Sequence, residues 1–591
     1  MFESVLIANR GEIACRLIRA CRELGVRTVA VYSEADRDAP HVRLADEAHL
    51  LGPAVASESY LDVARILRVA REAGAEAIHP GYGFLSENAE FARAVADAGL
   101  AFVGPPAAAI ESMGDKLSAR EVAGKAGVPV VPGTTSPVTD AAEAIAFGAE
   151  HGYPVAVKAM FGGGGRGMKI VTDAAAMAEA LESAQREAAA SFGRGECYLE
   201  RYLERPRHIE VQILADTDGT VIHLGDRDCS LQRRHQKLIE EAPAPGLAPA
   251  VRAAIARAAV EVSRAMGYVN AGTCEFLLDA DGETFYFLEM NTRLQVEHPV
   301  TELITGVDLV HAQLRIAAGA GMGLTQDDIR PRGHAIEARI NAEDPHRGFV
   351  PTPGTIVDLA PPLGPGVRFD VAARAGYEVP PYYDSLIGKL VVWAADRDTA
   401  IARLRLALDE LVITGIPTTT PFHRLAVRHP QFAAVEHSTV SVEREWELSG
   451  LPAHDTGDRE SEQSMVSSSP QRRSVRDVEL TIGGRATYVT VYGAAAAPPE
   501  PAAQTRRQRE RADRAADPVH AGPELTAPMQ GTVVKVAVAD RDPVTAGDLI
   551  CILEAMKMEN HIVAHRDGVV TVHRHPGDAV EKDTVLAVIQ D

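Results

Sequence analysis

The chain has 591 residues, of which 46% are hydrophobic and 24% charged, and its formal net charge at pH 7 is −22. This length has room for about four domains of ordinary size, and the strong negative charge argues against nucleic-acid and anionic-membrane partners. The sequence contains no apolar run long enough to span a membrane and begins with a strand-like segment. We therefore expect a cytoplasmic protein with no nucleic-acid partner and no membrane partner.

The N-terminal segment predicts a doubly wound α/β domain. A buried strand at Val5–Ala8 is followed by an amphipathic helix at Ile13–Leu24 and by a second strand at Thr28–Tyr32. This order is typical of nucleotide-fold enzymes in general. A Gly/Pro-rich loop, His79–Asn88, then follows a short strand, and by itself it fits a structural turn as well as a functional loop.

A glycine-rich segment indicates phosphate binding. Val155–Lys158 predicts a strand that ends in lysine, and Gly162–Met168 begins with four consecutive glycines. Backbone N–H groups of glycine approach phosphate oxygens closely, while Lys158 and the earlier Lys116 add positive charge. Because the lysine precedes the glycines, the segment is not a Walker loop.

The next segment, Cys197–Leu203, predicts a short strand that runs into a turn. Such a turn suits recognition of adenine by backbone groups, with Glu200 and His208 as polar contacts. Either residue alone would equally fit an ordinary surface group.

Two glutamates and an asparagine predict a metal site. Thr273–Leu278 and Phe285–Asn291 read as an antiparallel hairpin, and one bulge in it would place Glu275 and Glu289 on the same side. Asn291 shares that side by the period of two. Carboxylate and amide oxygens suit Mg²⁺ or Mn²⁺ bridging ATP phosphates.

The residues that follow predict an anion site next to the metal. Arg293, Gln295 and Glu297 alternate after Asn291, so we expect all of them to face the metal side. They provide a guanidinium for a planar anion, an amide to orient it and a carboxylate as base. Further candidates for this site are Lys237 with Gln232 and His235, and Arg339.

The composition changes after the α/β region. The stretch 455–473 is polar and Ser-rich, an alternating segment around Gly483-Gly484 predicts one hairpin, and 494–522 is rich first in Ala and Pro and then in Arg. With few large apolar residues, these flanking stretches cannot form a core of their own. We expect a linker long enough to let a C-terminal domain visit more than one site.

The C-terminal segment predicts a small carrier domain. Gly531–Val536 with Val544 and Leu549-Ile550 is echoed by Gly568–Val572 with Val580 and Val585-Leu586, which predicts a flattened, quasi-two-fold β-sandwich. Lys557 lies in Ala555-Met-Lys-Met558, on the crossing between the halves. A lone exposed lysine is usually a solvated charge, but two methionines at an exposed tip would be an aggregation cost unless something recognises them.

These motifs resemble two known components. Residues 1–445 resemble the biotin carboxylase component of biotin-dependent carboxylases, an ATP-grasp enzyme, and 523–591 resemble its biotin carboxyl carrier. The matching motifs are 81–88, 162–168, 233–237, 289–293 and 297–301, together with the tip that carries Lys557. The implied fold class is α/β with an ATP-grasp fold, followed by a C-terminal all-β flattened sandwich.

The resemblance also implies a division into domains. It places an N-terminal α/β domain at 1–113 and an ATP-grasp domain at 114–330, with a Gly-rich lid at about 131–203. A C-terminal domain at 331–445 would complete the carboxylase. A linker at 446–522, with its hairpin at 478–492, would then lead to the biotinyl carrier domain at 523–591.

Residue roles carry over from the resemblance position by position. Those implied for ATP are Lys116, Lys158, Gly164, Gly165, Glu200, Leu203, His208, Gln232 and His235. Those implied for metal are Glu275, Glu289 and Asn291, and those for bicarbonate are Lys237, Arg293, Gln295 and Val296. Glu297 is the implied base, Arg339 is assigned to the biotin oxyanion, and Lys557 is the biotin attachment site; the catalytic set is Arg293, Glu297, Arg339 and Lys237.

The implied reaction is the carboxylation of biotin by bicarbonate and ATP, with Mg²⁺ or Mn²⁺ as metal. Partners would be a biotin protein ligase and a separate carboxyltransferase β subunit of an acyl-CoA carboxylase, in a homo-oligomer within a larger assembly. The acyl acceptor stays open. One alternative is another ATP-grasp ligase fused to a lipoylated domain, and the 233–237 and 297–301 motifs argue against it. A second alternative is a biotinylated scaffold with an inactive ATP site, and the full set of named residues argues against that.

Overall fold

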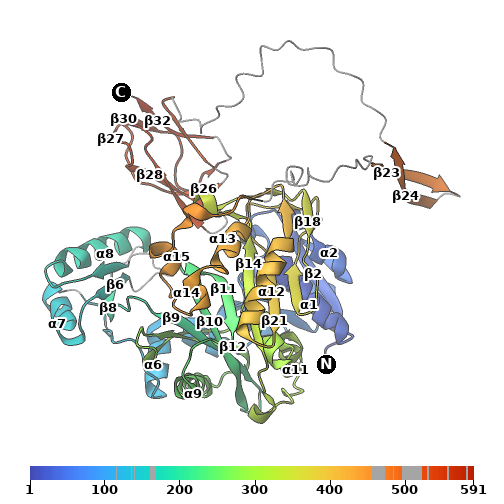
Figure 1. The fold of residues 1–591 in the computed structure, drawn as a ribbon, viewed down its shortest axis with the longest axis horizontal. Helices are drawn as coiled ribbons and strands as arrows, with labels where there is room; N and C mark the ends of the chain where they lie inside the picture. The colour runs from blue at the N-terminus through green and yellow to red at the C-terminus, as the bar shows by residue number, and fades with distance from the viewer. Residues whose placement is uncertain are drawn as a thin grey trace. The chain divides into compact units, whose positions relative to one another are not determined.

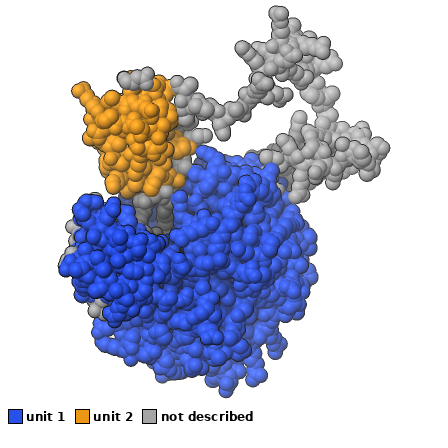
Figure 2. All heavy atoms as spheres, turned by 60° about the vertical axis from the view of Figure 1, so that its left-hand side comes forward, with its two compact units in different colours: residues 1–455, 555–558 blue, residues 456–554, 559–591 orange. Residues whose placement is uncertain are grey.

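The computed structural model describes residues 1–114, 116–134, 136–138, 140–159, 168–192, 195–454, 473–482, 485–494, 522–528, 531–555, 558–580 and 584–590. The chain forms two compact units, one of residues 1–455 with 555–558, and one of 456–554 with 559–591 (Figure 2). Among the described residues, no helix combines the length and apolar character needed to cross a membrane. All six cysteines are buried free thiols.

The N-terminal part of the first unit is a parallel sheet in the order β3-β2-β1-β4-β5. Its predicted start is confirmed, because a buried strand, a helix with an apolar face and a second buried strand follow one another. The elements are β1 (Ser4–Ile7), α1 (Gly11–Glu23), β2 (Arg27–Ser33), α2 (Pro40–Leu44), β3 (Glu47–Gly52), α3 (Val63–Glu72), β4 (Ala77–His79), α4 (Ala89–Asp97) and β5 (Ala101–Phe102).

An eight-stranded sheet, in the order β13-β12-β9-β10-β11-β14-β21-β19, is the centre of the unit. It runs without a break across the boundary expected near residue 330, because β11 pairs with β14. Its strands are β9 (Arg207–Ala215), β10 (Val221–Arg233), β11 (Gln236–Ala242), β12 (Asn270–Leu278), β13 (Phe285–Asn291), β14 (His334–Asn341), β19 (Val367–Val371) and β21 (Leu386–Ala394). The helices that accompany it are α5 (Ala107–Gly114), α6 (Lys116–Lys125), α9 (Pro249–Ala265), α10 (His298–Thr305) and α11 (Leu309–Ala317).

A smaller lobe projects from this unit at the left of Figure 1. It is a three-stranded sheet in the order β7-β6-β8 with two helices and a hydrophobic core of its own. The elements are α7 (Ala141–His151), β6 (Val155–Ala159), β7 (Lys169–Val171), α8 (Met177–Phe192) and β8 (Cys197–Arg201). The two strands predicted here, one ending near Lys158 and one at 197–203, are both present.

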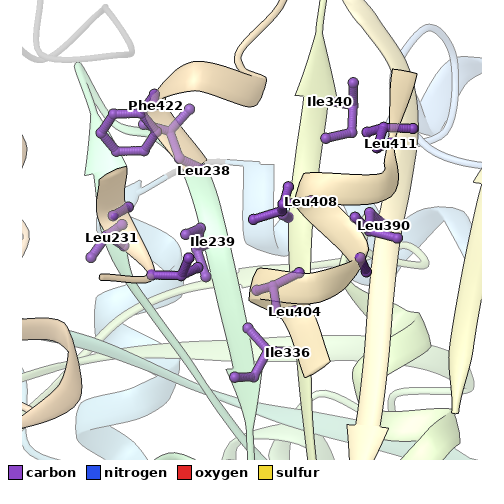
Figure 3. Packing of buried hydrophobic residues seen from close by; sticks show 14 of the residues in the cluster. Leu231, Leu238, Ile239, Ile336, Ile340, Leu390, Leu404, Leu408, Leu411 and Phe422 are labelled. Carbon is purple, nitrogen blue, oxygen red and sulfur yellow. The ribbon is translucent and has the colours of Figure 1, made fainter. Parts of the chain in front are cut away.

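The C-terminal part of the unit packs α12 on β11, β14 and β21 (Figure 3). Leu404, Leu408 and Leu411 recur at helical spacing and share one core with Leu390. Trp446, which we place in the linker, is also buried in this core. The remaining elements are β15 (Glu343–Asp344), β16 (Val350–Pro351), β17 (Gly354–Thr355), β18 (Asp358–Ala360), β20 (Glu378–Val379), α12 (Arg397–Glu410), β22 (Val412–Thr414), α13 (Thr420–Ala426), α14 (Pro430–Ala433) and α15 (Ser441–Arg444).

The predicted hairpin between the α/β region and the C-terminal domain is present and longer than expected. Strands β23 (Arg473–Ile482) and β24 (Arg485–Ala494) pair antiparallel, with Val478 opposite Val489. The alternating pattern locates the centre of the hairpin correctly.

The C-terminal domain has the two-fold β-sandwich that the internal repeat predicts. One sheet has the order β25-β32-β30-β27 and the other β29-β28-β26-β31, so each strand of the first half has a counterpart in the second. The strands are β25 (Glu524–Thr526), β26 (Gly531–Val536), β27 (Pro543–Val544), β28 (Leu549–Ala555), β29 (Met558–Val563), β30 (Gly568–Val572), β31 (Ala579–Val580) and β32 (Val585–Gln590). Lys557 falls between β28 and β29, outside the described residues.

The core under α12 yields a stability prediction. Leu404 is fully buried whereas Leu406, two positions along the same helix, is 60% exposed. We expect Leu404→Ala to lower the free energy of unfolding by about 2–5 kcal/mol, because it leaves a cavity. Leu406→Ala, the matched control, should change it by less than about 0.5 kcal/mol. Urea denaturation followed by circular dichroism measures both, and equal midpoints for the two variants would contradict this packing.

Candidate active site

A cavity of about 830 Å³ lies within the first unit. This volume is in the range of small-molecule sites. Its walls include the loop after β1, the small lobe, residues of the β9–β13 strands, the strand β14 with the loop before β21, and the region of α15. Predicted site residues that line it are Lys158, Glu200, Leu203, His208, Gln232, His235, Lys237, Glu275, Glu289, Asn291, Arg293, Gln295, Val296 and Arg339.

A single lysine connects the acidic groups of this cavity. The Lys237 ammonium group donates to Glu210 Oε2 at 2.6 Å, Glu275 Oε1 at 2.8 Å and Glu297 Oε1 at 2.6 Å. Burial alone would lower the pKa of Lys237, but Cys229 and these carboxylates raise it well above its ordinary value. Lys237 is therefore a permanent cation at the centre of the site.

Glu297 is held between two cations. Its Oε1 accepts from Lys237, and its Oε2 accepts from Arg339 Nη2 at 2.8 Å. Burial alone would raise the pKa of this carboxyl, but Lys237 and Arg339 hold it well below its ordinary range. Glu297 is consequently ionised at neutral pH.

Arg339 is fixed by a second carboxylate that the sequence did not point to. Its Nε donates to Glu240 Oε1 at 2.6 Å, and Nη2 lies 2.6 Å from the same oxygen, so Glu240 and Glu297 together hold the guanidinium. Burial raises the pKa of Glu240 to about 7, against the opposing effect of Arg339. Its cross-strand neighbour Glu337 is fully buried, and burial raises the pKa of Glu337 well above its ordinary value.

A buried arginine binds one of the carboxylates of this cluster. Arg227 is completely buried and contacts Glu210 through Nε, Gln212 at 2.8 Å and Thr301 at 2.9 Å. It holds one oxygen of Glu210 while Lys237 holds the other. The position of Lys237 is thus set by strands β9, β10 and β11 together.

The predicted metal hairpin has the expected geometry. Glu275 lies directly opposite Glu289 across β12 and β13, and the register shifts by one residue immediately after that pair, which is the predicted bulge. Two like charges directly opposite each other in a sheet are unfavourable unless a cation compensates them. Burial alone would raise the pKa of Glu275, but Lys237 and His208 lower it overall. The donor set of two carboxylates and the Asn291 amide fits a hard divalent cation.

Residues 292–297 differ in detail from the sequence expectation. β13 ends at Asn291 and α10 begins at His298, so the alternation of Arg293, Gln295 and Glu297 is not that of a strand. The three side chains nevertheless converge. Arg293 donates to Asn291 Oδ1 at 3.0 Å and to Gln295 Oε1 at 3.1 Å, and it also binds Glu87 at 2.9 Å.

The lobe contributes an ion-pair network. Lys158 at the end of β6 and Arg120 from α6 each bind one oxygen of the Glu200 carboxylate on β8. His208 on β9 lies 3.1 Å from Glu275, and burial would lower its pKa but Glu275 raises it overall. His208 thereby links the nucleotide candidates to the metal candidate Glu275.

The β10–β11 turn has a strained backbone. Arg234 and His235 both have positive φ angles, 47° and 63°, which residues other than glycine rarely adopt. Such strain is usually found at functional sites. It turns the exposed His235 back into the lining of the cavity.

Four predicted residues stay untested by this geometry. Gly164, Gly165 and Lys557 lie outside the described residues, and the side chain of Lys116 does as well, although its backbone begins α6. The remaining predicted residues line the cavity except Glu297, which is completely buried and contacts the lining residues Lys237 and Arg339.

Sequence reasoning missed the residues that position this set. Lys389 on β21 is fully buried, donates to the Val296 carbonyl at 3.0 Å and lies 3.1 Å from Glu12. The other missed members are Glu12, Tyr82, Glu87, Arg120, Glu210, Arg227 and Glu240. Most of these residues are charged side chains inside a strand or helix, which indicates a buried partner without naming it. Tyr82 and Glu87 instead lie in the loop of the 81–88 motif.

Family comparisons agree along the chain. The biotin carboxylase N-terminal domain matches residues 1–110, the ATP-binding domain of the carbamoyl-phosphate synthase L chain matches 115–325, and the biotin carboxylase C-terminal domain matches 337–444. The biotin-requiring enzyme family matches 523–589, and that domain is all-β as expected.

Individual relatives extend the match. The biotin-dependent acyl-coenzyme A carboxylase alpha3 subunit of Mycobacterium leprae is 48% identical over 99% of this chain and 98% of its own length. The biotin carboxylase of a Nostoc species is 54% identical over 75% of this chain and 99% of its own.

Solved structures show the same fold. The biotin carboxylase of Campylobacter jejuni, in a complex with a β,γ-ATP ligand, superposes with a TM-score of 0.71 at 47% identity, covering 75% of this chain and 99% of that one. The biotin carboxylase domain dimer of Hydrogenobacter thermophilus 2-oxoglutarate carboxylase, solved with MgADP, ADP and bicarbonate, gives 0.71 at 50% identity and covers 75% and 97%. The expected α/β ATP-grasp fold with an all-β carrier is confirmed. The chain belongs to the biotin carboxylase family, as an ATP-dependent biotin carboxylase with its biotinyl domain on the same polypeptide.

Proposed function

We propose that this chain is the α subunit of an acyl-CoA carboxylase, and that it carboxylates biotin held on Lys557 for a separate carboxyltransferase β subunit. The observation that carries the reaction is that Lys237 and Arg339 line one cavity with the metal-type hairpin and both bind the buried Glu297 carboxylate. The carboxyltransferase partner is supported by the full-length likeness to the Mycobacterium leprae alpha3 subunit. A biotin protein ligase would attach the biotin.

ATP would bind between the lobe and the central sheet. Lys158 and Lys116, with the backbone of Gly164 and Gly165, suit the phosphates, while Glu200, Leu203, His208, Gln232 and His235 would surround the nucleoside. A Mg²⁺ or Mn²⁺ ion held by Glu275, Glu289 and Asn291 would neutralise phosphate charge. The opposed Glu275–Glu289 pair supports this assignment, because a cation removes its repulsion.

Bicarbonate would bind at Lys237, Arg293, Gln295 and the Val296 backbone. Glu297 would take its proton as its oxygen attacks the γ-phosphate, which gives ADP and carboxyphosphate. A carboxyl with so low a pKa is a weak base. It becomes stronger when substrate anions draw the charge of Lys237 and Arg339 toward themselves, so the base is activated as the site fills.

Carboxyphosphate would break down to CO₂ and phosphate, and the phosphate can accept the N1 proton of biotin. Arg339 would then hold the oxyanion of the ureido group while N1 bonds to CO₂. Glu240, which holds the Nε edge of the guanidinium, acts as a positioning residue for that step. Lys389 likewise acts as a positioning residue, because it donates a hydrogen bond to the Val296 carbonyl.

The quaternary arrangement is proposed from relatives alone. The Hydrogenobacter thermophilus domain is described as a dimer, which supports a homo-oligomer. The domain ranges 1–113, 114–330, 331–445, 446–522 and 523–591 remain our proposal for the chain. Co-expression with candidate β subunits, followed by carboxylation assays on acetyl-CoA, propionyl-CoA and pyruvate, tests the acceptor; a complex that carboxylates pyruvate alone would overturn the acyl-CoA assignment.

Biotin attachment is tested on the carrier. We expect Lys557→Ala to abolish biotinylation but to preserve ATP-dependent carboxylation of free biotin, because the described residues that line the cavity all lie between Asn9 and Arg444. Lys535→Ala, an exposed lysine of the same domain, is the matched control and should stay biotinylated. Peptide mass spectrometry after expression with an active ligase reads the result, and biotin on another lysine would contradict the assignment.

The two half-reactions separate Glu297 from Arg339. We expect Glu297→Gln to lower bicarbonate-dependent ATP hydrolysis by about 10² or more, the scale of general-base loss, with little change in ATP affinity. Arg339→Ala should impair biotin carboxylation more than ATP cleavage, because its charge acts on the later step. Phosphate release and carboxybiotin are measured separately, with Glu283→Gln on the exposed β12–β13 turn as control. An equal loss of both activities in Arg339→Ala would refute its assignment to the second step.

The positioning role of Glu240 predicts a pH dependence of stability. The folded protein raises this carboxyl pKa from 4.5 to about 7, so it binds the proton more tightly than the unfolded chain does. Glu240 therefore lowers the free energy of unfolding as the pH rises through its pKa in the folded protein. We expect the urea midpoint of Glu240→Gln to depend less on pH than that of the wild type, between mildly acidic and mildly alkaline buffer.

The neighbouring carboxylate is the matched control. His334 and Arg397 lower the pKa of Glu241 against the effect of burial, so its contribution is lost only on strong acidification. Glu241→Gln should thus leave the pH dependence in that range unchanged. If Glu240→Gln also left it unchanged, Glu240 would not titrate near neutrality.

A further inference from the structure

Three potential metal ligands meet at a place that the reaction does not use. Asp344 Oδ1, His346 Nδ1 and His454 Nε2 converge in the first unit, with His454 coming from more than one hundred residues further along the chain. His346 Nδ1 lies 3.0 Å from His454 Nε2, His454 Nε2 lies 2.9 Å from Asp344 Oδ1, and His346 Nδ1 lies 3.5 Å from that oxygen. None of these three residues lines the active-site cavity.

Hydrogen bonding alone satisfies this triangle poorly. Two protonated nitrogens cannot face each other at 3.0 Å, so at most one of the two ring nitrogens carries a hydrogen there. That single hydrogen would be shared among three electron-rich atoms. If it is on His346, the lone pair of His454 faces the Asp344 carboxylate at 2.9 Å, which is repulsive. If it is on His454, this one hydrogen can bond to Asp344 at 2.9 Å, and the lone pair of His346 is then left at 3.0 Å from the same nitrogen without a hydrogen of its own.

The dimensions match a transition-metal site. Zinc bonds to histidine nitrogen and carboxylate oxygen are about 2.0–2.1 Å long, so ligand atoms of a tetrahedral site lie about 3.3–3.4 Å apart. The three observed separations of 2.9, 3.0 and 3.5 Å surround that value. An ion can therefore lie at bonding distance from all three atoms with little movement of the ligands.

Two of the ligands are held in place beforehand. Asp344 and His346 flank Pro345 on the short β15–η4 (Pro345–Arg347) segment, and the backbone N–H of His346 donates to Asp344 Oδ1 at 3.0 Å. Support of a carboxylate ligand by such a bond is typical of metal sites. Asp344 is almost buried, whereas His346 and His454 are 34% and 25% exposed, which leaves an open side for a water ligand.

We propose that Asp344, His346 and His454 bind one Zn²⁺ ion, or a similar imidazole-preferring divalent cation, as a clasp at the start of the linker. Two imidazoles and one carboxylate favour zinc, nickel or cobalt over Mg²⁺. His454 follows the last core contacts, Leu448 and Leu451, so the ion fixes the point from which the linker leaves the carboxylase core. The neighbouring Glu343 lines the active-site cavity, so this point lies beside its wall.

The test measures metal binding by the full-length protein. Metal-free wild type, His346→Asn and His454→Asn are titrated with Co²⁺, whose visible absorption reports nitrogen ligation, and with Zn²⁺ in competition. His151→Asn is the matched control, since His151 is similarly exposed but lies 3.8 Å from a single carboxylate. We expect wild type and His151→Asn to bind one Co²⁺ ion, and we expect His346→Asn and His454→Asn to bind it at least about tenfold more weakly. Loss of a residue that merely supports a metal ligand weakens metal binding by about tenfold or more, and loss of the ligand itself should weaken it at least as much. Any Co²⁺ binding that is the same in all four proteins is assigned to the carboxylates of the active site.

A second measurement reports the clasp itself. Hydrogen exchange of the peptide that ends at His454 should slow on addition of Zn²⁺ in wild type and in His151→Asn, but not in His346→Asn. His346 lies more than one hundred residues away, so this dependence would not arise from zinc bound elsewhere. Equal Co²⁺ affinity in all four proteins, or exchange that Zn²⁺ leaves unchanged in wild type, would overturn the proposal.

Discussion

The active site depends on the ammonium group of Lys237. Three carboxylates, from Glu210, Glu275 and Glu297, surround it within hydrogen-bonding distance, and Arg227 compensates Glu210 from the other side. Without this cation, three negative charges would be buried close together, and removing one partner of such a buried set commonly costs about 3–5 kcal/mol. The same lysine therefore stabilises the sheet and prepares the site for anions.

This arrangement explains why so many elements meet at one cavity. Lys237 follows a strained turn between β10 and β11, while its three acidic partners come from β9, from β12 and from the residue before α10. Arg339 on β14 extends the network to the C-terminal part of the unit through Glu297 and Glu240. The continuous eight-stranded sheet holds these groups in register, so they can act on one substrate without large backbone movements.

The network also gives the carboxylates different properties. Glu297 has a cation on each oxygen and stays ionised. Glu240 shares Arg339 with Glu297, and burial raises its pKa to about 7. Glu337 has no hydrogen-bond partner among the described residues, and burial keeps it protonated. One buried region thus holds an ionised base next to neutral or partly neutral carboxyls, which limits the total charge that the core must carry.

The sequence by itself determined the local chemistry and the order of the domains. Glycine runs, the Glu275–Glu289 hairpin with its bulge, the repeat in the carrier and the methionine-flanked Lys557 are encoded in neighbouring residues, because turns, strand alternation and hairpin pairing act over short distances. The family motifs added the roles of residues such as Lys237 and Arg339, whose spacing alone leaves several readings open.

Only the tertiary structure decided how these groups compensate one another. Lys389 is an isolated charge in an apolar strand, whereas Glu240 and Arg227 have charged neighbours in the sequence. The partners of all three lie on other strands or dozens of residues away. The convergence of Arg293, Gln295 and Glu297 depends on a non-strand segment fixed by Glu87 and α10, which alternation alone could not predict. The meeting of His346 with His454 likewise exists only after the chain has folded. Long-range electrostatic pairing depends on where the backbone carries each charge, and local sequence patterns contain no such distances.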